Sequence, residues 1–136
     1  MLLDITHARL MHLDWEMELE AMLSGRKRLK SVCGWHECIL GQWLYQEGIP
    51  RYGSISHVVT LEQEHKKFHE LAQQVVKYYQ SGHGERAAEL FKEVQRLSKE
   101  IIFLLTVIER QVVKRRQMSY MVRHPLKSLQ RVFRRH

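Results

Sequence analysis

Few residues in this chain interrupt a helix. Proline occurs only twice among 136 residues, at Pro50 and Pro125, and glycine occurs seven times. Because these two residues are the least favourable in a helix interior, long stretches of the chain are free to be helical. The sequence therefore predicts an all-α protein, and its length suits one domain with a buried core.

Apolar residues recur at helical spacing in several stretches separated by turn residues. We expect long helices over residues 2–24, 54–80 and 85–116, and a short second helix around residues 38–46 that ends at Gly48-Ile49-Pro50. Short connections between such helices favour an antiparallel four-helix bundle whose second helix is short.

Apolar positions mark the first and last of these helices. In the first helix, the residues near helical spacing are Leu3, Leu10, Leu13, Met17 and Met22 or Leu23. The last helix is apolar nearly all round between Ile101 and Ile108. That pattern predicts deep burial in the bundle or a dimer seam.

Basic residues are concentrated at the C-terminal end. The formal net charge is +7, yet no acidic residue follows Glu109, and residues 1–109 hold 13 basic and 15 acidic side chains. We therefore divide the chain into a bundle, 1–116, and a basic amphipathic tail, 117–136. Such a tail suits an anionic membrane surface or an acidic partner, or it packs back on the bundle. We do not expect nucleic acid as the partner, because the chain has no recognition motif for it.

The cysteines and the N-terminus indicate the compartment. Cys33 and Cys38 are the only cysteines, and a pair five residues apart suits no disulfide framework of a small secreted protein. The first residues lack the basic and apolar regions of an export signal, and the longest apolar stretch is far shorter than the roughly 20 residues of a membrane span. We expect a cytoplasmic protein.

Histidine is abundant, and two of the nine histidines are placed to act together. His65 and His69 lie at positions i and i+4 of the third predicted helix, where one metal ion can bind both. The residue after His65 is Lys66, not the glutamate that a metalloprotease uses as its general base, so hydrolase chemistry loses its main support. The competing interpretation is an ordinary pair of surface histidines.

Two further donors lie in the other predicted helices, His12 in the first and Cys38 in the second. With His65 and His69 they form a His₃Cys set, which suits the tetrahedral geometry and the nitrogen and sulfur preference of Zn²⁺. Four protein ligands leave no open position, which is typical of a structural or regulatory site. Taken alone, a cysteine such as Cys38 is more often a small buried residue than a ligand.

The joint pattern resembles the chemoreceptor zinc-binding (CZB) domain family. It consists of His12-Leu13-Asp14-Trp15, 22 residues, Cys38-Ile39-Leu40-Gly41-Gln42-Trp43, 21 residues, and His65-Lys66-Lys67-Phe68-His69. The resemblance implies that His12, Cys38, His65 and His69 bind zinc in a helical bundle, commonly a homodimer. It also implies supporting roles for Trp15, Gly41 and Trp43, although core packing explains both tryptophans as well.

Members of this family are usually attached to chemoreceptors or diguanylate cyclases. The resemblance therefore implies a zinc-dependent sensory or regulatory domain, not an enzyme, that responds to zinc level or to oxidation of Cys38 by hypochlorous acid or peroxide. This sequence has no methyl-accepting coiled coil and no cyclase domain, so its output would pass through a signalling partner, a dimer interface or the basic tail.

Three alternatives stay open at this point. One is a helical adaptor with a purely structural zinc, whose basic tail recruits a partner or a membrane. Another is a di-iron protein, which needs repeated Glu-x-x-His motifs, whereas the chain has one, at Glu62 and His65. The last alternative is a different ligand set. Cys33 and His36 lie just before Cys38, outside the matched residues, and either could replace a ligand, while Cys33 could also act as a resolving thiol.

Overall fold

The computed structural model describes residues 5–126, and every regular element within that range is a helix, which confirms the all-α prediction. In chain order the elements are α1 (Ile5–Leu23), α2 (Ile39–Trp43), the π-helix η1 (Leu44–Gly48), α3 (Ile49–Tyr52), α4 (Ser56–Gln80) and α5 (Gly84–Arg123). Residues 24–38 form a long connection that contains no helix, with one turn directly after α1 and another before α2.

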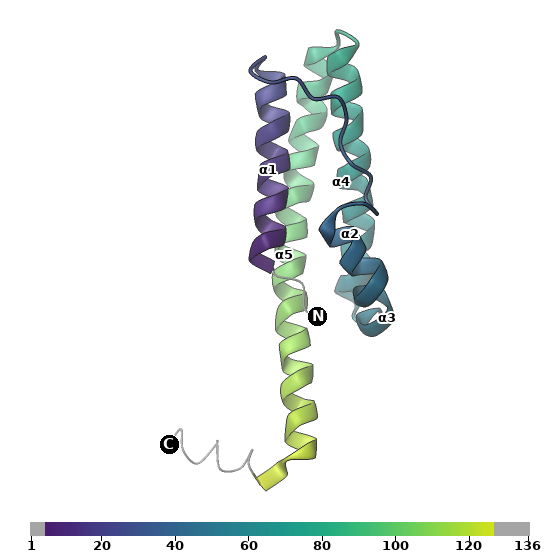
Figure 1. Cartoon of the computed structure of the whole chain (residues 1–136), viewed down its shortest axis with the longest axis vertical. Helices are drawn as coiled ribbons and strands as arrows, with labels where there is room; N and C mark the ends of the chain where they lie inside the picture. The colour runs from purple at the N-terminus through teal and green to yellow at the C-terminus, as the bar shows by residue number, and fades with distance from the viewer. Residues whose placement is uncertain (1–4, 127–136) are drawn as a thin grey trace.

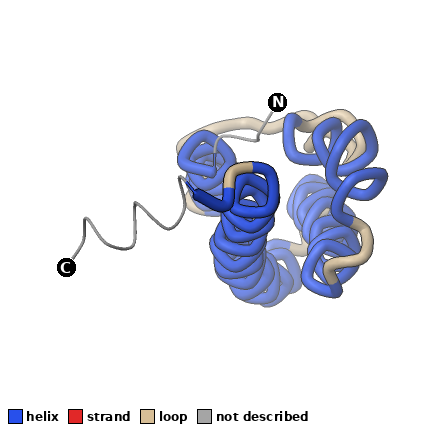
Figure 2. Tube along the Cα trace, turned by 90° about the horizontal axis from the view of Figure 1, so that it is seen from below, coloured by secondary structure: helices blue, strands red, loops and turns tan. Residues whose placement is uncertain are grey.

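Three long helices lie side by side and the short ones cover one side. Figure 1 shows α1 and α4 running in one direction and α5 in the other, with α5 packed against both. The segment α2–η1–α3 runs beside α4, and the connection from α1 passes over the end of the molecule to reach it. The end-on view shows the helices gathered around a common interior (Figure 2).

The apolar residues that mark α1 in the sequence divide between the core and the surface. Met22 is 1% exposed, whereas Leu10, Leu13 and Met17 are 55%, 44% and 67% exposed. At 100° per residue, the buried positions of α1 lie on the opposite side of the helix. One of them is a histidine, which a search for apolar residues alone passes over. The buried residues are Ala8, His12, Leu19 and Met22.

The second helical segment is longer than predicted. The expected stop at Gly48-Ile49-Pro50 is wrong, because the backbone stays in the right-handed helical region through Gly48 and Ile49 and continues to Tyr52. The Ile49 N–H bonds the carbonyl of Leu44, five residues back, which widens the helix into a π turn. Pro50 then occupies the second position of α3, where its missing N–H costs little.

The core lies mainly between α4 and α5. The fully buried side chains include Phe68 and Val75 of α4 and Leu97, Ile101 and Leu105 of α5. Each such side chain contributes roughly 1.5–3 kcal/mol on burial. The expectation of deep burial holds for one side of the 101–108 stretch, where Ile101, Leu104, Leu105 and Ile108 are buried. It does not hold all round the helix, because Phe103 is 64% exposed.

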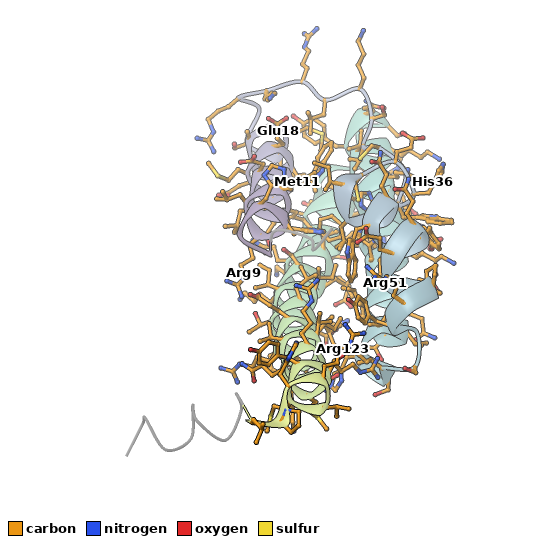
Figure 3. All side chains as sticks on the ribbon, turned by 60° about the horizontal axis from the view of Figure 1, so that its bottom comes forward. Arg9, Met11, Glu18, His36, Arg51 and Arg123 are labelled. Atoms are coloured by element: carbon orange, nitrogen blue, oxygen red, sulfur yellow. The ribbon has the colours of Figure 1, made fainter. Side chains whose placement is uncertain are left out.

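Helix α5 continues beyond the rest of the molecule. It passes residue 116, where we placed the end of the bundle, without a break and ends at Arg123 (Figures 1 and 3). Met118, Met121 and Val122 are exposed on this extension. The remainder of the predicted basic tail, residues 127–136, lies outside the described residues. Among the helices that are described, none combines the length and apolar character needed to cross a membrane.

Candidate metal centre

Helix α4 places two histidines in the interior. His65 and His69 are each 1% exposed, and their Nε2 atoms lie 3.0 Å apart. Their positions at i and i+4 put both rings on the side of α4 that also buries Leu61, Phe68 and Ala72. The pair is therefore part of the core and not the surface pair that was the competing interpretation.

Cys38 reaches the same point from the start of α2. It is the N-cap of that helix, and its Sγ accepts a hydrogen bond from the Gly41 N–H at 3.3 Å. The same Sγ lies 3.1 Å from His65 Nε2. Donor atoms of Cys38, His65 and His69 all lie within 4.8 Å of one another, and all three residues are buried.

His12 approaches from α1. It is 3% exposed, and its ring centroid lies 5.9 Å from that of His65 and 4.8 Å from that of Phe68. Its Nδ1 is buried and has no hydrogen-bond partner within residues 5–126. His12 is not part of the tight three-residue group, but it lines a cavity of about 10 Å³ together with Cys38 and His69.

Burial shifts the pKa of each of these groups. Desolvation lowers the pKa of His12 to about 3 and that of His65 to about 2, and it lowers the pKa of His69 as well. The three imidazoles are therefore neutral at neutral pH, which is the form that binds a metal ion. Desolvation also raises the pKa of the Cys38 thiol, so metal binding there must displace a proton.

The donor set and its spacing fit zinc. Two nitrogen ligands on a tetrahedral zinc lie about 3.3–3.4 Å apart, given Zn–N bonds of about 2.0–2.1 Å. The Nε2 atoms of His65 and His69, 3.0 Å apart, are close to that value. A sulfur and a nitrogen ligand lie about 3.6 Å apart, given a Zn–S bond of about 2.3 Å, so Cys38 Sγ, now 3.1 Å from His65 Nε2, needs to move outward by about half an ångström. A buried, unpartnered Nδ1 on His12 would gain a partner from an ion in the adjoining cavity.

Contacts outside this group hold its members in place. His69 Nδ1 lies 2.8 Å from the carbonyl oxygen of Cys33, so this nitrogen donates and Nε2 is left to accept or bind. Gly41 lies against the Trp35 backbone so closely that an added Cβ would overlap the Trp35 carbonyl oxygen. Trp15 lines the small cavity.

Trp43 has a different environment from Trp15. It packs over Gly48, where an added Cβ would lie 2.7 Å from the Trp43 ring. The indole therefore supports the π turn of η1, and it does not line the cavity beside the histidines. For Trp43, the contact is therefore core packing, which was the alternative to a supporting role at the metal site.

The residues that flank the motif are placed differently from the donors. His36 is exposed at the outer edge of the loop (Figure 3), 3.8 Å from the Glu37 carboxylate. Cys33 is half-buried and contributes its carbonyl, a contact that side-chain patterns in the sequence do not reveal.

The fold and the donor cluster define a class of protein, an all-helical domain with a buried cysteine and histidine site suited to a metal ion. Residues 12–76 match the family model of the chemoreceptor zinc-binding domain, which confirms the resemblance drawn from the sequence. The match begins at His12 and includes Cys38, His65 and His69, and it ends within α4. Comparisons with curated proteins and with solved structures gave no significant match. The family match and the cluster together point to zinc.

Proposed function

We propose that this protein is a zinc-dependent sensory or regulatory domain whose ion is bound by His12, Cys38, His65 and His69. The observation that carries the proposal is the buried cluster of Cys38, His65 and His69, with donor atoms within 4.8 Å. His12 is the fourth ligand in this proposal because it is buried beside the cluster with an unpartnered Nδ1.

Regulation suits this site better than catalysis does. Four protein ligands complete a tetrahedron and leave no position for a substrate or an activated water. The adjoining cavity, at about 10 Å³, has room for roughly one water-sized probe. The proposal therefore assigns the protein no enzyme activity of its own.

The ligands come from three separate parts of the fold, which connects the site to the packing of the helices. His12 belongs to α1, Cys38 caps α2, and His65 and His69 belong to α4. Binding energy at a site that the unfolded chain lacks becomes folding energy, so gain or loss of zinc changes how these parts hold together.

Oxidation of Cys38 is the second trigger in this proposal. A zinc-bound cysteine is a thiolate, and hypochlorous acid or peroxide converts a thiolate to a sulfenic acid. The Gly41 N–H already bonds the sulfur, so a change there acts directly on the start of α2. We propose that the change in metal binding and helix packing, caused by oxidant or by the zinc level, is the signal that the domain transmits.

The signal would leave the domain through an interface. Leu10, Leu13 and Met17 form an exposed apolar face on α1, opposite to the side that lines the site. We propose that this face, together with exposed Phe103 of α5, packs against a second copy in a homodimer. A chemoreceptor or diguanylate cyclase type of partner would receive the output, in keeping with the family match.

The first experiment is elemental analysis of protein purified without added metal. We expect about one zinc per chain in the wild type and its loss in Cys38→Ala and His65→Ala. His36→Ala is the matched control, since this histidine lies on the same loop but is exposed. Absence of zinc from the wild type, or zinc retained by both ligand variants, would overturn the proposal.

A second function is favoured by the far end of α5. Arg115, Arg116 and Arg123 lie on an exposed extension that also carries Met118 and Met121. This surface suits a helical adaptor in which zinc is structural and the basic end contacts an acidic partner or an anionic membrane. Zinc that persists, with unchanged conformation, after a stoichiometric dose of hypochlorous acid would favour this function.

A further inference from the structure

The second cysteine lies directly beside the site. Cys33 is half-buried and packs against the core, and its carbonyl oxygen is the partner of His69 Nδ1 at 2.8 Å. It belongs to the long connection between α1 and α2, which has no helix of its own. This segment can therefore rearrange locally without breaking a helix.

The ring of His69 links the two cysteines. Its Nδ1 contacts the Cys33 backbone, and the His69 donor atom lies within 4.8 Å of Cys38 Sγ. Between the cysteines the chain turns back, with the Glu37 N–H bonded to the Gly34 carbonyl at 3.1 Å.

We propose that Cys33 is the resolving thiol of this site, forming a disulfide with Cys38 after Cys38 is oxidised and so opening the metal centre reversibly. The inference rests on the proposed function and specifies how it is regulated. Its supports are the position of both cysteines on one connection, with a turn between them, and their shared neighbour His69.

The reaction has two balanced steps. In the first, the Cys38 thiolate attacks one oxygen of hydrogen peroxide, the O–O bond breaks, and sulfenic acid and hydroxide are formed. In the second, the Cys33 sulfur attacks the Cys38 sulfur and the S–O bond breaks. The departing hydroxide takes the Cys33 proton and leaves as water. Peroxide is the two-electron oxidant, and the two thiols are oxidised to one disulfide.

Disulfide formation would affect the site at two points. Cys38 would lose the thiolate charge that binds a metal ion, and the new S–S bond would pull on the backbone at Cys33, whose carbonyl bonds His69 Nδ1. Without Cys33, a sulfenic acid on Cys38 persists and is open to irreversible oxidation to the sulfinic acid. Cys33 therefore makes the response reversible.

The test uses the full-length, zinc-loaded chain treated with stoichiometric hydrogen peroxide. Both cysteines lie on one tryptic peptide, residues 31–51, so mass spectrometry shows the disulfide as a loss of two hydrogens together with protection from alkylation. Zinc release is followed with a chromogenic chelator, and zinc content is measured again after dithiothreitol and added zinc. We expect release with near-complete recovery in the wild type.

Cys33→Ser supplies the comparison, and Cys33→Ala replaces it if the serine variant does not fold. In the variant we expect the peptide to gain oxygen, and zinc recovery to be at least about twofold lower than in the wild type. Wild-type peptide without the internal disulfide, a disulfide between two chains on a non-reducing gel, or equal recovery in the variant would overturn the inference. Those results leave the proposed function standing if zinc is bound and released, whereas a wild type without zinc would overturn the proposed function itself.

Discussion

The Nδ1 of His69 lies 2.8 Å from the carbonyl oxygen of Cys33, although 36 positions separate the two residues in the chain. A carbonyl oxygen only accepts, so this contact places the ring proton on Nδ1 and leaves the lone pair of Nε2 facing His65 and Cys38. The connection between α1 and α2 thus sets the tautomer of a metal-binding histidine on α4.

Substitution of His12 tests the fourth ligand. We expect His12→Ala to weaken zinc binding by at least about tenfold, because three donors would remain from a set of four. The competition of a chromogenic chelator for zinc measures this change. His83→Ala, at an exposed histidine, is the control and should bind zinc as the wild type does. Unchanged affinity in His12→Ala would remove this residue from the site.

Removal of the metal should destabilise the fold. Zinc at a free concentration 1,000 times its dissociation constant stabilises the folded state by about 4.1 kcal/mol. We therefore expect chelation to lower the Tm of the wild type by several degrees, with little change in Cys38→Ala, which lacks the site already. Calorimetry with and without chelator measures this shift, and equal Tm values in the wild type would contradict it.

Gly41 should tolerate no side chain. An added Cβ would overlap the Trp35 carbonyl oxygen, and that backbone also lies beside Cys38. We expect Gly41→Ala to lower the free energy of unfolding by about 1–3 kcal/mol and to weaken zinc binding. Gly84→Ala is the matched control, because nothing lies within 4 Å of a Cβ there. Denaturant unfolding compares the two variants, and equal stabilities would contradict the prediction.

The metal-free protein should lose stability as the pH falls. Burial lowers the pKa of His65 to about 2 and that of His12 to about 3, from an ordinary value of 6.5. Below pH 6.5 the unfolded chain therefore binds protons that the folded chain does not, so the free energy of unfolding decreases with falling pH. The slope approaches about 1.4 kcal/mol per pH unit for each such histidine.

Denaturant unfolding between pH 7 and pH 4, with chelator present, measures this slope. His65→Gln removes one of the titrating groups, so its slope should be shallower than that of the wild type. A wild-type stability that is flat across this range would show that the histidines are protonated in the folded state.

The exposed apolar face of α1 should govern association. We expect Leu13→Glu, alone or with Met17→Glu, to shift the protein from dimer to monomer, because a charge in an apolar interface is not solvated. Val59→Glu, at a position of α4 that is 46% exposed, is the matched control. Sedimentation velocity measures the state of each variant, and a monomeric wild type would contradict the proposed dimer.

The sequence by itself determined the helical class, the approximate positions of the long helices and the donors worth testing. These predictions depend on local properties of the chain: the scarcity of proline and glycine, the helical spacing of apolar residues in α4 and α5, and the i, i+4 pair of His65 and His69. Local periodicity has a physical basis in the 3.6-residue turn, so it survives into the structure.

Only the tertiary structure decided which side of α1 is buried and what surrounds the donors. Leu10, Leu13 and His12 lie on a helix with apolar residues on both sides, and the choice between the sides depends on what α4 and α5 present to them. The contacts of Cys33 with His69 and of Trp35 with Gly41 involve backbone oxygens, which carry no sequence signature. Such contacts arise when distant segments pack together, and for that reason they could not be predicted from the order of the residues alone.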